Sequence, residues 1–353
     1  MKSTFNIFKL SLALTVVMTS IASVKAQDIH FSQFYMMPLQ QNPSMAGAIH
    51  PVEANIVFKD QWKAVASPYR TFAMGYHMRF NKNKNTNGYL AAGLNFFSDK
   101  AGDANLGTGN GALSIAYHIK ADENNTFGAG ISAGYMQRKI DFSNLTWASQ
   151  YDGQTLNSSL QAGAYGTSSF TNFDLGAGAN WTYNNSGGDI KVTGNNDLNF
   201  NIGLGVFHLN RPDYSFLGST ENQPMRIVAH GTGVISIPDS KWAFVPGFMY
   251  ARQGPAQEIF VGTLMRYLLS QNSKFTGLKN GAALYAGAYF RTKDAIAAKM
   301  IIEYAGWAFG VGYDINVSSL QTVSKFRGGL ELSLRFVAPN PFQSNYGGNN
   351  SRY

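Results

Sequence analysis

The feature that most constrains this chain is a strict alternation of apolar and polar residues, as in KFRGGLELSLRF at residues 325–336. One face carries Phe326, Gly328, Leu330, Leu332, Leu334 and Phe336, and the other carries Arg327, Gly329, Glu331, Ser333 and Arg335. A period of two residues is typical of a β-strand between two different environments. The apolar face could meet a protein core, as in a soluble sandwich, or lipid, as in a membrane barrel with a polar lumen.

The same alternation recurs along most of the chain. It is clear over residues 70–80, 173–183, 296–304 and 307–315, and about fourteen segments show it in all. Their expected starts lie near residues 52, 70, 88, 109, 126, 171, 197, 224, 242, 256, 280, 296, 307 and 326. Most segments are about 9–11 residues long, enough to cross a bilayer at a tilt, whereas strands of soluble proteins average about 5–6 residues.

Composition and the placement of aromatic residues favour lipid as the outer environment. Only 14% of the residues are charged, against about 25% in ordinary soluble domains. Aromatic residues gather at the ends of predicted strands, as at Phe72, Phe80, Trp181 and Trp307, where an interfacial girdle belongs. We therefore predict an all-β fold, a transmembrane antiparallel β-barrel of about fourteen strands over residues 51–337.

The chain begins with a segment typical of a secretory signal peptide. Lysines precede an apolar stretch that starts at Leu10, and the stretch closes with VKA, which resembles a cleavage site. We expect removal of residues 1–26 and a mature chain that starts at Gln27. No later stretch approaches the ~18 uninterrupted apolar residues of a membrane helix.

The lengths of the connections predict how the barrel is oriented. Short connections are expected at residues 81–87, 120–125 and 237–241, and longer ones at 98–108, 138–170 and 209–223. Short periplasmic turns and long external loops give this rhythm. Both termini, including a tail at residues 338–353, are therefore expected in the periplasm.

The motifs argue against cofactor, metal and nucleic-acid sites. Cysteine is absent, and the six histidines never pair at metal-ligand spacing. The glycine runs at 107–111 and 128–134 lack the helix of a phosphate-binding loop, and the acidic stretch at 99–107 lacks the bidentate glutamate of a calcium loop. No basic cluster is interleaved with aromatic residues, as nucleic-acid binding would require. We expect no cofactor, no metal and no nucleic-acid partner.

The charged residues on the polar faces have a structural explanation. We expect them to face the lumen and to pair with one another and with water, and we predict that the protein is not an enzyme. The residues concerned are Arg79, Asp174, Glu303, Arg327 and Glu331.

Two segments are candidates for contacts. Residues 27–50 do not alternate, and this segment is either a functional plug or partner contact, or an inert tether that packs the barrel floor. Its candidate residues are Phe31, Phe34, Tyr35, Asn42 and Pro43. The longest connection, 138–170, is expected to form a lid or docking surface, since loops of that length are usually functional or disordered. Its candidate residues are Trp147, Tyr151 and Asp152.

Several stretches resemble one protein family. They are QDIHFSQFYMMPLQQNPSMAGA (27–48), FKDQW (58–62), ISAGYMQRKIDFSNLTWASQYDG (131–153), FDLGAGANWTY (173–183), FHLNRP (207–212) and VGYDINVSSLQTVSKFRGGLELSLRF (311–336). The chain thereby resembles the PorP/SprF family of type IX secretion and gliding-motility outer-membrane proteins. The matches cover nearly the whole expected mature chain.

This resemblance implies a component of type IX secretion, required for secretion or surface display of specific, adhesin-like cargo. The implied partners are outer-membrane lipid, other type IX secretion components and cargo with a C-terminal sorting domain. A different class remains open, a transporter of hydrophobic small molecules like the long-chain fatty-acid channels, which also have about fourteen strands and an N-terminal plug. A general diffusion porin ranks lower because the N-terminal segment suggests an occluded lumen. A transporter would need an apolar pocket near residues 31–37 that opens toward a lateral gap, whereas a secretion component would have a closed, polar lumen.

Overall fold

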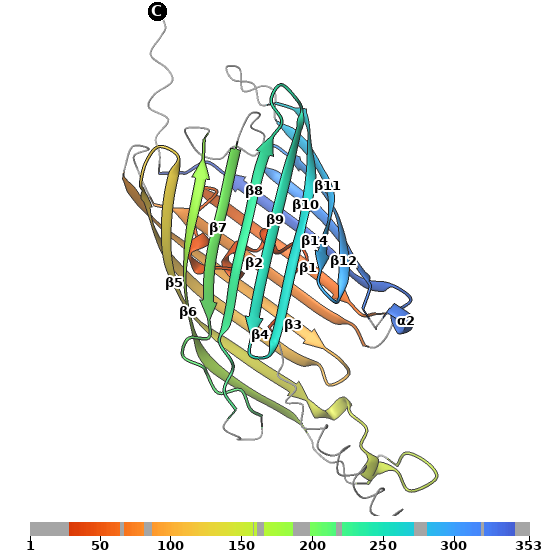
Figure 1. Cartoon of the computed structure of the whole chain (residues 1–353). Coiled ribbons are helices and arrows are strands. Elements are labelled where there is room, and N and C mark those ends of the chain that lie inside the picture. The colour runs from red at the N-terminus through yellow and green to blue at the C-terminus, as the bar shows by residue number, and fades with distance from the viewer. Residues whose placement is uncertain are drawn as a thin grey trace, which may run out of the picture.

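Fourteen antiparallel strands form the wall of a closed barrel in the computed structural model (Figure 1). The structure describes residues 28–63, 67–80, 87–157, 159–160, 166–185, 198–216, 221–271, 281–318 and 321–342. Each strand pairs with the next along the chain, and β1 pairs with β14 to close the ring. The predicted barrel of about fourteen strands is confirmed. The expected signal peptide, Gln27 and residues 343–353 of the expected tail lie outside the described residues.

The observed strands begin close to the expected positions, with the largest difference at β6. The strands are β1 (Val52–Gln61), β2 (Tyr69–Arg79), β3 (Gly88–Ala101), β4 (Leu106–Lys120), β5 (Asn125–Asp141), β6 (Thr167–Asn184), β7 (Leu198–Phe207), β8 (Arg226–Ser236), β9 (Trp242–Gln253), β10 (Ala256–Ser270), β11 (Ala282–Arg291), β12 (Ala295–Tyr304), β13 (Trp307–Asn316) and β14 (Arg327–Ala338). In the part of the chain that the structure describes, helical structure is limited to α2 (Gln321–Ser324) and short 3-10 turns. Among the described residues, no helix is both long and apolar enough to span a bilayer.

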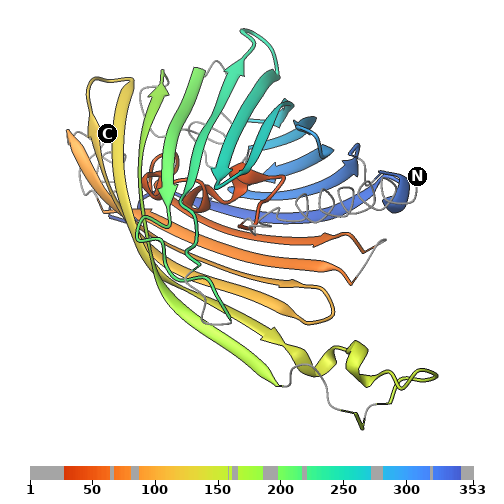
Figure 2. The same ribbon diagram turned by 60° about the horizontal axis from the view of Figure 1, so that its bottom comes forward.

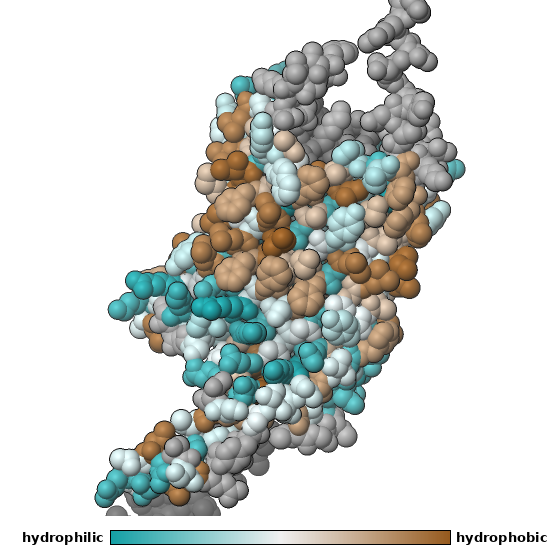
Figure 3. All heavy atoms as spheres, turned by 180° about the vertical axis from the view of Figure 1, so that it is seen from behind, coloured by the Kyte–Doolittle hydropathy of each residue, from teal (hydrophilic) through white to brown (hydrophobic). Residues whose placement is uncertain are grey.

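Side-chain burial follows the predicted period of two. In β12 and β13 every second side chain is buried in the lumen and the others are exposed. The exposed side chains are largely apolar, including Ile302, Phe309 and Leu330. In a space-filling view they form a band over the middle and upper part of one face, with hydrophilic side chains gathered below it (Figure 3). Such a band is what a lipid-facing surface requires.

The strands of one side are longer than predicted. β3, β4, β5 and β6 have 14, 15, 17 and 18 residues. The expected long connection at 98–108 is instead a tight hairpin, because β3 continues to Ala101 and β4 starts at Leu106. Gly102 and Asn105 turn the chain with positive φ values of 66° and 45°, which glycine and asparagine tolerate best.

The two ends of the barrel differ. We call the end where β1 starts and β14 stops the terminal end, and the other the distal end. The distal end carries the connection between β5 and β6, with the 3-10 turns η4 (Phe142–Asn144) and η5 (Ala148–Gln150), and this hairpin projects well beyond the ring (Figures 1 and 2). It also carries the β7–β8 connection and α2.

Residues 28–51, which we call the plug, run through the lumen from the distal to the terminal end. The plug contains three 3-10 turns, η1 (Phe34–Met36), η2 (Pro38–Gln40) and η3 (Pro43–Met45). Figure 2 shows it inside the ring of strands. Most of its side chains are buried, so the apolar residues of this segment find their core in the lumen.

Candidate functional site

The distal end of the plug is held by a buried charged cluster. Both ring nitrogens of His208, which follows β7, meet carboxylates: Nε2 lies 2.6 Å from Asp28 Oδ2 and Nδ1 lies 2.8 Å from Asp174 Oδ1. The side-chain amide of Gln223 donates to the other oxygen of Asp28 at 2.9 Å, and that of Gln253 does so at 3.2 Å. This cluster, which we call the distal anchor, joins the plug to three segments of the wall.

The charges of the distal anchor shift the pKa values of Asp28 and His208. Burial would lower the pKa of His208, but the carboxylates of Asp28 and Asp174 outweigh burial and raise it to about 10. Burial would raise the pKa of Asp28, but attraction to His208 and its hydrogen bond outweigh burial and hold the pKa well below its usual range. At neutral pH the anchor therefore contains an imidazolium between two carboxylates.

The stability of the distal anchor should depend on pH. Asp28 stabilises the anchor fully above its unfolded pKa of about 4, and this stabilisation is lost at lower pH. His208 stabilises the anchor fully below about pH 6.5, and this stabilisation is lost as the pH rises through its folded pKa of about 10. Amide protection of residues 28–33, corrected for intrinsic exchange, should be highest between about pH 4 and 6.5 and fall toward pH 10. His208→Gln should lower protection and remove its alkaline decline. An unchanged decline in that variant would contradict the assignment.

The middle of the plug is bound by charged side chains of β12–β14. The carboxylate of Glu331 accepts the backbone N–H groups of Ser32 and Gln33 at 2.8 and 2.6 Å. Ser32 Oγ donates to Asp314 Oδ2 at 2.8 Å, and Lys299 Nζ donates to the carbonyl of Ser32. These groups are buried, so each would lose hydrogen bonds without the plug, and unpaired buried charge is costly.

Further residues of the wall satisfy the same stretch of backbone. Lys59 Nζ donates to the carbonyl of His30 at 3.1 Å, and the side-chain amide of Asn55 donates to the carbonyl of Met36. Ser333 Oγ donates to Gln33 Oε1 at 2.9 Å. Short 3-10 turns leave many backbone groups without partners in the plug itself, and the wall supplies those partners.

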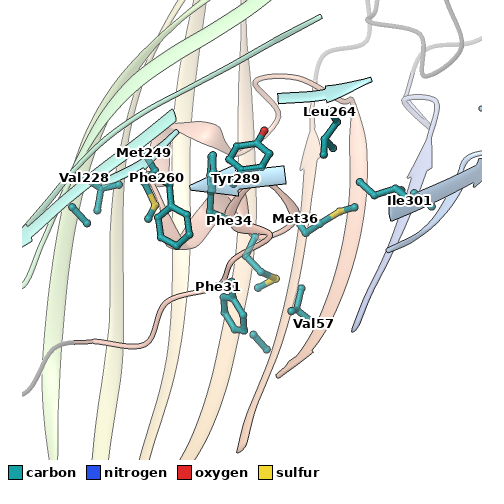
Figure 4. Close-up of a cluster of buried hydrophobic side chains, with 14 residues drawn as sticks. Phe31, Phe34, Met36, Val57, Val228, Met249, Phe260, Leu264, Tyr289 and Ile301 are labelled. Atoms are coloured by element: carbon teal, nitrogen blue, oxygen red, sulfur yellow. The ribbon is translucent and has the colours of Figure 1, made fainter. Parts of the chain in front are cut away.

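An aromatic cluster fixes the plug beside this network. The ring centroid of Phe34 lies 5.7 Å from that of Tyr289 and 6.1 Å from that of Phe260, both on the wall. Lys299 Nζ lies 3.7 Å from the ring centroid of Tyr289, within cation–π range. Phe31 and Phe34 are each 1% exposed, and Figure 4 shows both among the buried side chains of plug and wall. These two phenylalanines are therefore core residues of the plug.

Asn42 and Pro43 place the third turn against the opposite wall. Asn42 caps η3, since its Oδ1 accepts the N–H of Ser44 at 2.9 Å, and its amide donates to the carbonyl of Ala179 at 2.9 Å. The wall is lined by glycine here, and a Cβ on Gly130 would lie only 2.7 Å from Ser44 Cα. The small residues of the 128–134 run thus leave room in the lumen, and the plug occupies that room.

The terminal end of the plug is held through its carbonyl groups. The guanidinium of Arg79 donates to the carbonyls of Gly47, Ala48 and Ile49 at 2.6, 3.2 and 3.0 Å. A ring nitrogen of His118 lies 2.8 Å from the carbonyl of Ala46. The plug is therefore bound to the wall at both ends and in the middle.

A cavity remains between one side of the plug and the wall. Its apolar lining includes Phe34, Tyr35, Met36, Leu264 and Ile301. Its polar lining includes Glu53, Arg266, Glu303 and Arg335. Among these, Arg335 donates to Glu303 at 2.5 Å. The cavity is amphipathic and lies next to residues 31–37.

The loop candidates lie apart from the plug, in the projecting β5–β6 hairpin. Tyr151 is 56% exposed, whereas Trp147 is partly buried. Asp152 closes a local turn, because its Oδ1 accepts the N–H groups of Gln154 and Thr155 at 2.9 and 2.8 Å. The two sets of candidate residues therefore lie in separate parts of the molecule.

The match to a protein family settles what kind of chain this is. A model of the family described as type IX secretion system membrane protein PorP/SprF matches residues 23–336. The chain belongs to the PorP/SprF family. The resemblance seen in the sequence is confirmed, and the family together with the barrel fold identifies an outer-membrane β-barrel component of type IX secretion. The family also implies interaction with other type IX components.

Solved structures similar to this PorP/SprF barrel share little sequence with it. A deletion mutant of the TodX monoaromatic hydrocarbon channel is 11% identical, with a TM-score of 0.44 and 84% of this chain and 91% of that chain covered. A FadL homologue of Pseudomonas aeruginosa is 10% identical, with a TM-score of 0.41 and coverage of 84% and 92%. BamA of Haemophilus ducreyi lacking POTRA domains 1–3 is 10% identical, with a TM-score of 0.40 and coverage of 82% and 70%. No curated protein matches the chain.

The expected pairing of inward charges needs correction. Glu303 does pair with Arg335, but Arg79 and Glu331 also bind backbone of the plug. Arg327 is exposed, because the pairing of β13 with β14 shifts between Asp314 and Ile315. No local pattern in the sequence indicated that these charges bind the backbone of the plug.

Sequence reasoning also missed residues that hold the plug. Asp28, Ser32 and Gln33 fall within the family's QDIHFSQF opening, but their contacts lie far away in the sequence, at His208 and Glu331. Of the predicted candidates, Phe31, Phe34, Tyr35, Asn42 and Pro43 all lie in the lumen. Their contacts with a partner stay a prediction.

Proposed function

We propose that this PorP/SprF barrel is a non-enzymatic, plugged component of type IX secretion that serves the secretion or surface display of adhesin-like cargo with a C-terminal sorting domain. The observation that carries the proposal is the plug, which occupies the lumen from end to end and is bonded to the wall along its length. A barrel filled in this way is suited to act through its surfaces, by contact with cargo and with periplasmic machinery.

The proposed orientation places the terminal end, where β1 starts and β14 stops, in the periplasm, and the start of the plug at Asp28 at the exterior end of the lumen. The distal end carries the long β5–β6 and β7–β8 connections, and long loops usually face the exterior in outer-membrane barrels. In this orientation the exposed Tyr151 of the projecting hairpin would meet surface partners. The terminal end, where the plug leaves the lumen beside β14, would meet the periplasmic machinery.

One observation favours a second candidate function, transport of hydrophobic small molecules. The cavity lies beside Phe34, Tyr35 and Met36, where such a transporter would need an apolar pocket. The polar contacts of the plug with the wall favour the secretion component instead. They hold the plug in the lumen, through which a diffusing molecule would have to pass. The two functions make opposite predictions in a deletion strain.

A deletion strain separates these functions. Loss of the barrel should leave particular surface proteins trapped in the periplasm, while uptake of a labelled fatty acid stays normal. Surface and periplasmic proteomes, together with the uptake assay, should be compared between wild type and deletion. Normal surface display with lost uptake would reject the secretion proposal and support the transporter.

A point variant tests the contact surface at the distal end. Tyr151→Ala removes an exposed aromatic ring from the projecting hairpin, and interface aromatics often contribute more than about 1 kcal/mol to binding. Complementation with this variant should reduce surface display of the cargo. Tyr117→Ala is the matched control, since Tyr117 is 52% exposed on the outer face of β4. Equal display in both complemented strains would remove Tyr151 from the contact surface.

A further inference from the structure

The barrel wall is interrupted beside the cavity, between β8 and β9. Cross-strand pairing runs to Thr232 opposite Gly247 and resumes at Ile235 opposite Phe244. The two rungs between them, which would pair Gly233 and Val234 with β9, are missing from strands that the structure describes in full. Pro246 lies at this point of β9 and has no N–H group to donate. The pairing of β8 with β9 therefore has a gap of two residue pairs here.

The cavity reaches the wall at this interruption. Its lining includes Val234 and Val245, which face the lumen. It also includes Gly233 and Phe200, which lie on the outward-facing side of β8 and β7. The Phe200 ring crosses Gly233 closely, so that a Cβ on Gly233 would lie 2.8 Å from Phe200 Cδ1. The cavity thus reaches the wall at Gly233, which the Phe200 ring covers on the outer side.

The surface around the interruption is apolar. Ile235, Phe244 and Phe248 are 39%, 43% and 40% exposed on the outer face. Inside, Leu264 and Ile301 continue the apolar lining toward Met36 of the plug. The molecules that meet this outer face in a membrane are lipids, and their apolar chains match both the outer surface and the inner lining.

We propose that the cavity takes up an acyl chain from the membrane through a lateral opening between β8 and β9, bounded by Phe200, Gly233, Val234 and Val245. The chain lies along Leu264 and Ile301 against Met36, and the polar head group stays at the wall or at the polar lining around Arg266. The juxtaposition of an unpaired stretch of wall, a cavity on its inner side and apolar residues on both faces carries this proposal. It does not depend on the role of the barrel in secretion.

Photo-crosslinking tests this proposal on the full mature chain in phosphatidylcholine vesicles. One sample contains a phospholipid with a diazirine in its acyl chain, and a second contains a diazirine fatty acid, so that the two sources of acyl chain are distinguished. After irradiation, mass spectrometry maps the adducts. Adducts should form on the outer residues Phe244 and Phe248 and also on the luminal residues Leu264 and Ile301.

Variants of the opening decide whether the chain enters there. Val234→Trp fills the opening and should reduce luminal adducts about fivefold, because a packed wall excludes even one methylene chain. Phe200→Ala widens it and should increase them. Val261→Trp, on the exposed outer face of β10, is the control and should change neither. Heat-modifiable gel mobility checks that each barrel is folded.

Two outcomes would overturn the proposal. One is adducts on the outer face only, in wild type and in Phe200→Ala alike. The other is luminal labelling that neither Val234→Trp nor Phe200→Ala changes, which would place the entry route at an end of the barrel. Loss of secretion in a cell would bear on neither outcome, since the measurement uses the purified protein.

Discussion

A barrel that lacks residues 28–49 should conduct ions where the full-length barrel does not. The strand ladder does not depend on the plug for its hydrogen bonds, so the wall should remain closed. The lumen that is emptied would expose Lys59, Lys299, Asp314 and Glu331, and a water-filled polar lumen passes ions. Stepwise conductance in planar bilayers is the measurement.

A second deletion provides the control for this experiment. Removal of residues 145–155 shortens the projecting hairpin but leaves every contact between plug and wall in place. That variant should stay closed. A plug deletion that folds, as judged by heat-modifiable mobility, and still fails to conduct would contradict the role assigned to residues 28–49.

Arginine at neighbouring positions of β14 should damage two different parts of the molecule. Leu332 lies on the outer face, and Leu332→Arg should cost about 2–4 kcal/mol if the site is near the bilayer midplane, which lowers the folded fraction of the barrel. Ser333 is 2% exposed and donates to Gln33 of the plug. Ser333→Arg should therefore displace the plug and leave the barrel folded.

Two measurements on the same samples distinguish these effects. Detergent-resistant gel mobility reports the folded barrel and should fall for Leu332→Arg only. Bilayer conductance reports the displaced plug and should rise for Ser333→Arg only. If Ser333→Arg lowered the folded fraction more than Leu332→Arg, the assignment of the two faces of β14 would be wrong.

The wall was predictable from sequence because its signal is local. A strand between lipid and lumen places alternate side chains in different environments, so β12 and β13 reveal both their extent and their faces in ten residues each. The signal weakens where glycine occupies both faces. The run at 107–111 hid the extension of β4 toward the tight hairpin at Gly102, so a loop was expected there.

The contacts of the plug were beyond prediction because their partners are distant and nonperiodic. Ser32 and Glu331 are separated by 299 positions, and no local pattern relates them. A charged residue on the polar face of a strand can line a water-filled lumen or bind the backbone of a plug. The sequence around Arg79 and Glu331 does not distinguish these two roles. Exposure of Arg327 depends on a shift in one strand pair, which alternation alone does not reveal.

The bonds between Glu331 and the plug give the segment before β1 a part in assembly. The ring closes when β1 pairs with β14, and in that pairing Lys59 lies opposite Glu331. A slip of β14 by one residue would turn Glu331 toward lipid and bring a leucine against the backbone of Ser32 and Gln33. Only the correct seam gives those two N–H groups an acceptor. The N-terminal segment thus favours the correct register of β14 at the seam.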